Sequence, residues 1–573
     1  MRADNALDTR LRAAIEVFEA GELDRALQMV ERLRHSHPHM AIVHNVHGVI
    51  AAELGAYRVA VESYQKAISL EPGNCDFHFN LGNVLRDKGD LKTALASYRA
   101  ALKIRPDDPD VAFNMASVLR GLGQLNGAKK LFEQLAEVSP EDHTVHSNLG
   151  GVLLQLGQTE TAIDCFRRTL KLNPGSAEAH DSLCEALENT DRIDDYRKAV
   201  AAARTACRPD DIMIVTRQAR LLRDDKQLED ARKVLSAVTR FDPGQAPLNS
   251  AYWYLHGDIC DRLEDARAAY AAFVEANLWA AKTAAGRGLE PEKFVAGLDD
   301  LQGVYKTLSR GASPESAAQT DAPQLVFLVG FPLSGSTLLA TALRHHSRIT
   351  VVAEEPMVQE MAAQAAGSPD HERLTDDQVK QLRSTYMARL SRCLPERAEA
   401  GDVVIDSLPL NIVQAGLLSR VFPDARFLLA LRHPCDCVLS CFMHDFRLDD
   451  VMANFLDLKS AARCYDKVMS VWSACTSALQ LPVHTVKHEQ LVGDPEAVAR
   501  KVLDHLDLEW EEAKAGKADT AIDHKPVAKS GHARVAQPIC SHTNGRWRRY
   551  RAHMVPVLPT LLKWAEIHGY SND

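Results

Sequence analysis

The chain has 573 residues, of which 46% are hydrophobic and 25% are charged, and its formal net charge is −10. This length and composition exclude a disordered or fibrous chain and predict about two to four folded domains. The acidic balance argues against a nucleic-acid-binding protein that depends on an overall basic field, so any phosphate-binding site must be built locally.

Residues 1 to 26 alternate charged and small apolar side chains and lack the apolar stretch of a signal peptide. No uninterrupted apolar run approaches the roughly 20 residues that a membrane span requires, so we expect a cytoplasmic protein without such a span. The 12 cysteines are scattered, as is typical of reduced thiols. Cys435, Cys437 and Cys441 lie close together, but no second ligand group accompanies them, so we expect no metal.

The first part of the chain repeats itself every 34 residues. Prolines recur at this interval as Pro38, Pro72, Pro106, Pro140 and Pro174. Glycines do the same as Gly21, Gly55, Gly89, Gly123 and Gly157, each followed five residues later by an alanine. Because glycine tolerates the positive φ of a tight turn, the pattern predicts helical hairpins that turn at each glycine. Tyr64, Tyr98, Phe132 and Phe166 are expected to fill the space between neighbouring hairpins.

This pattern resembles the tetratricopeptide-repeat family over residues 10 to 174 and continues in a degenerate form, so that we count about seven units. The resemblance implies an all-α superhelical repeat solenoid over residues 1 to 280. Such solenoids have a concave groove, and we expect a protein or peptide partner there. The alternative is a spacer or a dimerisation arm. Residues 281 to 322 are interpreted as a helix followed by a linker rich in small and polar residues.

A phosphate-binding loop is predicted directly after this linker. Residues 325 to 329 form a short apolar run typical of a buried parallel strand, the loop from Gly330 to Thr337 follows, and residues 338 to 343 are helical in pattern. Backbone N–H groups and the helix N-terminus can together bind an anion there. Ser336 occupies the position of the lysine found in ATPases and GTPases, which argues against both classes.

A second apolar strand, residues 426 to 432, ends with Arg432 and runs into a predicted helix start from His433 to Ser440. The guanidinium group and the hydroxyl group could bind a second phosphate at the end of a parallel strand. Alternatively, Arg432 pairs with Asp436 as an ordinary strand-end arginine.

Both motifs resemble those of sulfotransferases that use 3′-phosphoadenosine-5′-phosphosulfate as the donor, and further similar segments follow in family order at 405–411, 487–491, 534–539 and 545–550. The resemblance implies a three-layer α/β P-loop-type domain with a parallel sheet over residues 323 to 573. It also implies a set of donor-binding residues: Ser334, Gly335, Ser336, Thr337, Leu338, Arg432, Ser440, Gly545 and Arg546.

Glu354 and Glu355 follow the next predicted strand, residues 349 to 352. This segment resembles that of tyrosylprotein sulfotransferases, in which a glutamate at this place is the catalytic base, and we favour Glu355 over Glu354. A surface pair of glutamates is the alternative.

Three positions depart from the family pattern: Leu333 and Ser407 stand where the family has basic residues, and His433 stands where it usually has Asp or Asn. Positive charge could come instead from Arg344, His433, Lys525, Lys529 or Arg534. Two hypotheses follow: a sulfotransferase whose repeats bind the acceptor or a partner, or a weakly active or inactive nucleotide-binding scaffold whose repeats mediate protein–protein interaction. The acceptor is not predicted.

Overall fold

The computed structural model describes residues 2–307, 323–365, 374–394, 402–511 and 544–571. It divides into two compact units, Met1–Leu221 and Leu222–Asp573. The predicted linker at 308–322 and the segment at 534–539 lie outside the described residues, as do Lys525 and Lys529.

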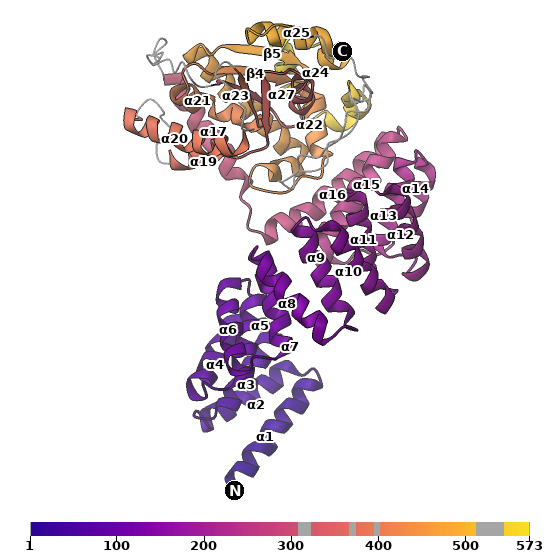
Figure 1. Ribbon diagram of the computed structural model, residues 1–573, viewed down its shortest axis with the longest axis vertical. Helices are drawn as coiled ribbons and strands as arrows, with labels where there is room; N and C mark the ends of the chain where they lie inside the picture. Colours follow the sequence, from indigo (N-terminus) through magenta and orange to yellow (C-terminus); the bar gives the residue numbers. More distant parts are fainter. Residues whose placement is uncertain (1, 308–322, 366–373, 395–401, 512–543, 572–573) are drawn as a thin grey trace. The chain divides into compact units, whose positions relative to one another are not determined.

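Paired helices make up the first unit and follow one another along the chain (Figure 1). The pairs are α1 (Arg2–Glu19) with α2 (Leu23–Ser36), α3 (Ala41–Glu53) with α4 (Tyr57–Leu70), α5 (Cys75–Asp87) with α6 (Leu91–Ile104), α7 (Pro109–Gly121) with α8 (Leu125–Val138), α9 (His143–Gln155) with α10 (Thr159–Leu172), and α11 (Ala177–Asn189) with α12 (Ile193–Ala206). Helix α13 (Ile212–Asp224) follows them. The predicted solenoid of helical hairpins is confirmed.

Turn geometry explains why the glycines recur. Each of the five predicted turn glycines has a positive φ, from 72° at Gly55 to 87° at Gly89. Packing explains the aromatic residues, because a Cβ on Gly82 would lie 2.6 Å from the ring of Tyr98. The aromatic ring thus occupies the space that the missing side chain leaves open.

The second unit contains repeat-like helices of its own: α14 (Leu228–Leu235), α15 (Ala246–Arg262) and α16 (Ala266–Gly286). Lys226 and Glu264 adopt the positive φ of the earlier turn glycines, and a Cβ on Gly257 would lie 2.7 Å from Phe273. Among the described residues, the first unit has six helix pairs and the second has the pair α15–α16. The pair α11–α12 was not among the predicted hairpins, because Asp191, with φ of 55°, stands in place of its turn glycine.

A five-stranded sheet, entirely parallel, lies at the centre of the second unit (Figure 1). Its order is β2-β3-β1-β4-β5. The strands are β1 (Gln324–Gly330), β2 (Ile349–Ala353), β3 (Val403–Ser407), β4 (Arg426–Leu431) and β5 (Val483–Lys487). The chain leaves the central strand β1 toward β2 on one side and later crosses it to reach β4 on the other. Ligands bind at the carboxyl ends of the strands in sheets of this kind.

Alternating side chains of β1 face two layers of helices. Val326 and Leu328 share an apolar core with α18 (Ser336–Leu343), α24 (His488–Gly493) and α25 (Pro495–His505). Phe327 and Val329 face the opposite layer. That layer contains α19 (Met357–Gln364), α20 (Asp376–Cys393), α21 (Ala415–Val421), α22 (Pro434–Phe442), α23 (Leu458–Leu479) and α27 (Leu558–Ile567). The predicted three-layer α/β architecture is confirmed.

Short helices connect these elements: η1 (Pro243–Gln245), η3 (Pro409–Gln414), η4 (Met452–Leu456), η6 (Arg546–Tyr550) and α26 (Arg551–Met554). The core on the second face also includes Tyr254, Phe273, Leu298 and Tyr305, which belong to α15, α16 and α17 (Pro291–Thr307). The last repeat-like hairpin and α17 therefore complete the core that covers the sheet.

Among the described helices, none combines the length and the apolar character needed to cross a membrane. The described cysteines are free thiols.

Candidate active site

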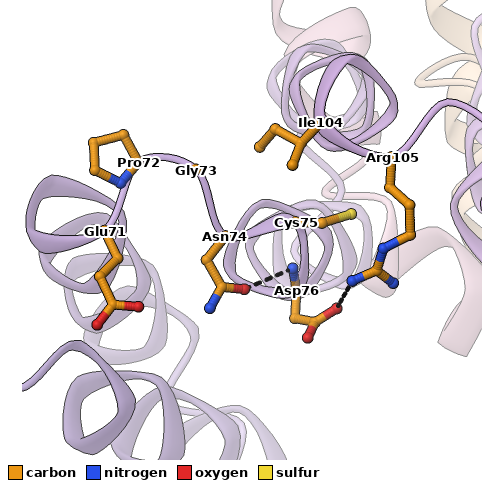
Figure 2. Close-up of a pocket in the computed structure, with 8 residues that line it drawn as sticks. All are labelled: Glu71, Pro72, Gly73, Asn74, Cys75, Asp76, Ile104 and Arg105. Carbon is orange, nitrogen blue, oxygen red and sulfur yellow. Dashed lines mark hydrogen bonds and ion pairs between the residues drawn. The ribbon is translucent and has the colours of Figure 1, made fainter.

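Two surface hollows are lined by residues other than those predicted for the site. One, of about 460 Å³, lies between two repeats (Figure 2) and is lined by Glu71, Pro72, Gly73, Asn74, Cys75, Asp76, Ile104 and Arg105. Its polar groups already have partners: the Asn74 side chain accepts the backbone N–H of Asp76 at 3.1 Å, and Arg105 donates to the Asp76 carboxylate at 3.1 Å (Figure 2). The other, of about 480 Å³, is lined mainly by α16 and by the segment from Ala453 to Leu458, and it is mostly apolar. Neither contains the chemistry that the sequence predicts.

The strand register brings the predicted site residues to one edge of the sheet. Ser407 at the end of β3 is level with Leu328 of β1 and Ala353 of β2. The loop after β1, the glutamates after β2 and Arg432 after β4 consequently lie at the same edge.

The loop from Phe331 to Gly335 joins β1 to α18 in a turn with two left-handed residues. Leu333 has φ of 62° and Gly335, the N-cap of α18, has φ of 100°. Left-handed residues in such turns aim successive N–H groups into one concavity, where they bind anions. Thr337 and Leu338 lie in the first turn of α18, with Thr337 exposed and Leu338 packed against the core. The thiols of Cys437 and Cys441 donate to the carbonyl oxygen of Pro332, so these cysteines support the loop.

Unsatisfied polar atoms around this loop fit a phosphate group. The Ser334 hydroxyl is buried and has no partner among the described residues, and the same holds for both ring nitrogens of His488. A Cβ on Gly335 would lie 2.5 Å from the His488 Nδ1, so only glycine leaves this space open. Burial, with a smaller contribution from Arg432, lowers the pKa of His488 to about 4, so the ring is neutral near pH 7. Sequence reasoning gave His488 no role, although its position directly after β5 was a usable signal.

A second cluster combines Arg432, Ser440 and Arg546. Arg432 donates to the Ser440 hydroxyl at 3.1 Å and to the Leu333 carbonyl at 3.3 Å. Arg546 reaches the same hydroxyl at 3.1 Å, although it lies 106 residues further along the chain. Two guanidinium groups that share one hydroxyl favour a bound anion with two or more acceptor oxygens.

Asp436 holds the segment that carries Arg546. Its carboxylate accepts the backbone N–H groups of Gly545 at 2.6 Å and of Trp547 at 2.8 Å. The indole of Trp547 stacks on His433, with ring centroids 5.2 Å apart, and burial lowers the pKa of His433. Stacking and the lowered pKa both disfavour a charged His433 ring at this place.

Glu354 and Glu355 lie at the end of β2, as predicted. Glu354 has a left-handed φ of 59°, and its N–H donates to the Ser407 carbonyl at 3.2 Å. Glu355 is half-buried and pairs with Arg389 of α20 at 3.4 Å. Arg344 lies instead at the far end of α18 and is exposed. Arg389, which the sequence analysis did not consider, is thus a cation beside the predicted base.

Asp406 is buried below this edge, next to Ser407. Tyr386 donates to its carboxylate at 2.9 Å and Asn411 at 3.3 Å. Burial raises the pKa of Asp406 from 3.8 to about 7, against the lowering effect of the Tyr386 hydroxyl.

An Asp406→Asn variant is expected to gain stability relative to the wild type as the pH rises. The raised pKa means that the folded chain holds a proton that the unfolded chain loses above about pH 4, so the wild type is penalised progressively between pH 4 and pH 7. At about 1.4 kcal/mol per pKa unit, the relative gain is on the order of 4 kcal/mol. Thermal unfolding of both proteins from pH 4 to pH 8 measures it. A melting-temperature difference that stays constant over this range contradicts the assignment.

These features define a class: a parallel α/β domain with a left-handed loop and a helix N-terminus after its central strand, and a basic cluster after the neighbouring strand. Residues 323–512 match the profile described as "Sulfotransferase family". Residues 11–74 and 113–177 match the profile described as "Tetratricopeptide repeat", and residues 82–121 match a further "TPR repeat" profile. The chain therefore carries tetratricopeptide repeats followed by a sulfotransferase-family domain.

Known proteins are similar in sequence to part of this chain. An uncharacterized protein of Aquifex aeolicus is 23% identical over 41% of this chain and 32% of its own length. Protein-tyrosine sulfotransferase 1 of Danio rerio is 27% identical over 37% of this chain and 61% of its own length. The alignments thus span about a third and about three fifths of these relatives. The solved structure of PilF from Pseudomonas aeruginosa is 16% identical, covers 38% of this chain and 100% of its own, and has a TM-score of 0.34.

Proposed function

We propose that the second unit is a sulfotransferase that uses 3′-phosphoadenosine-5′-phosphosulfate. The observation that carries this proposal is the shared contact of Arg432 and Arg546 with the buried Ser440 hydroxyl, beside the loop after β1. The match to sulfotransferases and the relationship to a protein-tyrosine sulfotransferase support the same reaction class.

The chain would hold the two ends of the donor at different places. The loop N–H groups, with Ser334 and the N-terminus of α18, would bind the 5′-phosphosulfate. Arg432, Ser440 and Arg546 would bind the 3′-phosphate through charge-assisted hydrogen bonds. When bound, the donor supplies the sulfuryl group, which passes to an acceptor hydroxyl oxygen as the bond to the 5′-phosphate oxygen breaks. We assign no step to a metal ion.

Glu355 would take the proton of the acceptor hydroxyl. It lies at the end of β2, one strand away from the loop across β3, and Arg389 orients its carboxylate. General-base catalysis of this kind contributes about 10²- to 10⁴-fold to a rate.

Partner binding is assigned to the repeats. Tetratricopeptide repeats commonly bind proteins or peptides, so we assign them the acceptor or a partner protein. The free thiols of the described residues support function in the cytoplasm.

Incubation of the full chain with ³⁵S-labelled donor and a panel of tyrosine peptides and simple phenols tests the proposal. Transfer of label to at least one acceptor is expected. Donor binding without transfer to any of them would overturn the assignment of activity.

A second candidate function is a nucleotide-binding scaffold whose repeats mediate protein–protein interaction. The observation that favours it is the absence of basic side chains at Leu333 and Ser407. Losing one donor that stabilises the transition state costs on the order of 3 kcal/mol.

A Leu333→Arg variant separates the two candidates. If the wild type is active, the added cation is expected to raise turnover about tenfold or more, whereas Leu333→Met, which adds no charge, leaves turnover unchanged. An inactive wild type together with an active Leu333→Arg variant would instead support the function as a nucleotide-binding scaffold. Single-turnover transfer of label from the donor measures both.

A further inference from the structure

Asp261 of the last repeat-like hairpin reaches the segment that carries Arg546. It lies in the last turn of α15 and is buried. Its carboxylate accepts hydrogen bonds from the Tyr550 hydroxyl at 2.6 Å, from Arg549 at 3.1 Å and from Arg546 at 3.3 Å. Asp261 and Arg546 are 285 residues apart in the chain.

Arg546 therefore connects Asp261 to the basic cluster. One of its terminal nitrogens contacts Asp261 and the other contacts Ser440, which Arg432 also contacts. The side chain of Arg546 is only 16% exposed. Both ends of its guanidinium group are thus fixed by partners.

Electrostatics explains why a carboxylate is needed at this place. Arg432, Arg546 and Arg549 bring three positive charges close together, and like charges in a partly buried site repel one another. Without Asp261, Arg546 would gain by turning toward solvent. With Asp261, the cluster keeps its geometry and still has excess positive charge for an anion.

The hairpin that carries Asp261 is also fixed to α22, the helix that contains Ser440. Asn277 of α16 donates to the Phe442 carbonyl at 3.0 Å. Tyr270 of α16 stacks on His553, with ring centroids 4.0 Å apart and an interplanar angle of 12°. The position of Asp261 relative to Ser440 is consequently determined by packing on both sides.

We propose that Asp261 is a positioning residue of the donor site, which holds Arg546 in the orientation that binds the 3′-phosphate. The proposal rests on the proposed function, since it takes the ligand of Arg432, Ser440 and Arg546 to be that phosphate. It makes the hairpin α15–α16 part of the donor site.

Calorimetric titration of the full chain with two nucleotides tests this role. Asp261→Asn is expected to weaken binding of adenosine 3′,5′-bisphosphate about tenfold and to leave binding of adenosine 5′-monophosphate unchanged, because the latter lacks the 3′-phosphate. Asp258→Asn is the matched control, because Asp258 lies on the same helix and pairs with Arg262 and Arg223. It should change neither affinity.

A double-mutant cycle separates positioning from general destabilisation. If Asp261 acts through Arg546, Asp261→Asn should have almost no effect in an Arg546→Ala background. Equal effects in both backgrounds, equal loss for both nucleotides, or unchanged or tighter bisphosphate binding would overturn the proposal. If Asp261→Asn does not fold, Tyr550→Phe removes one partner of the same carboxylate, and it should weaken bisphosphate binding alone.

A wild type that does not bind the bisphosphate would overturn the proposed function and this inference together. A wild type that binds it, with an affinity that Asp261→Asn does not lower, overturns only the inference.

Discussion

An Arg432→Ala variant of the full chain is expected to bind adenosine 3′,5′-bisphosphate about a hundredfold more weakly than the wild type. Arg432 is 6% exposed, and it contacts both the loop after β1 and Ser440. Hydrogen bonds to charged groups contribute about 1.5–3 kcal/mol each, and about 2.8 kcal/mol corresponds to a hundredfold change in affinity. Isothermal titration calorimetry measures the loss directly.

Arg426→Ala is the matched control for this variant. Arg426 is the first residue of β4, the strand that Arg432 follows, so it lies at the opposite edge of the sheet, where it pairs with Asp507. Its removal should lower stability without changing nucleotide affinity. Equal affinities of the wild type and Arg432→Ala would show that the donor site was assigned to the wrong residues.

Glu355→Gln is expected to lower turnover at least a hundredfold while donor affinity stays within about twofold, as for a general base that does not contact the donor phosphates. Gln keeps the shape of the side chain and its contact with Arg389 but cannot accept a full proton. Single-turnover rates with saturating donor, combined with bisphosphate titration, separate the two effects.

Glu360→Gln is the control because Glu360 also lies near Arg389, at 3.9 Å, but on α19, away from the strand end. It should retain nearly full turnover. Loss in Glu354→Gln with normal rates in Glu355→Gln would move the base to Glu354. Normal rates in both variants would show that neither glutamate at the end of β2 is the general base.

Local patterns in the sequence predicted most of the fold. The 34-residue interval is a property of neighbouring hairpins, and it therefore survives as a visible period. The alternation of short apolar runs with helical segments similarly indicated a parallel sheet. The 34-residue pattern of glycines breaks down at Asp191, Lys226 and Glu264, because these residues adopt the positive φ of the turn in place of a glycine.

Site residues that directly follow a strand could be predicted from the sequence. Site residues whose roles depend on contacts with remote parts of the chain could not. Arg432 and the loop after β1 each follow a recognisable strand. Asp261 and Arg389 carry no local signal, because their roles arise only when α15 and α20 pack beside residues far away in the chain. Predicting them requires the tertiary structure.

Titration of the wild-type chain with adenosine 3′,5′-bisphosphate, adenosine 5′-monophosphate and ATP tests the central claim most directly. If Arg432, Ser440 and Arg546 bind the 3′-phosphate as proposed, the bisphosphate is expected to bind at least about a hundredfold more tightly than the monophosphate, which lacks that group. Equal affinity for the bisphosphate and the monophosphate, or a preference for ATP, would contradict it.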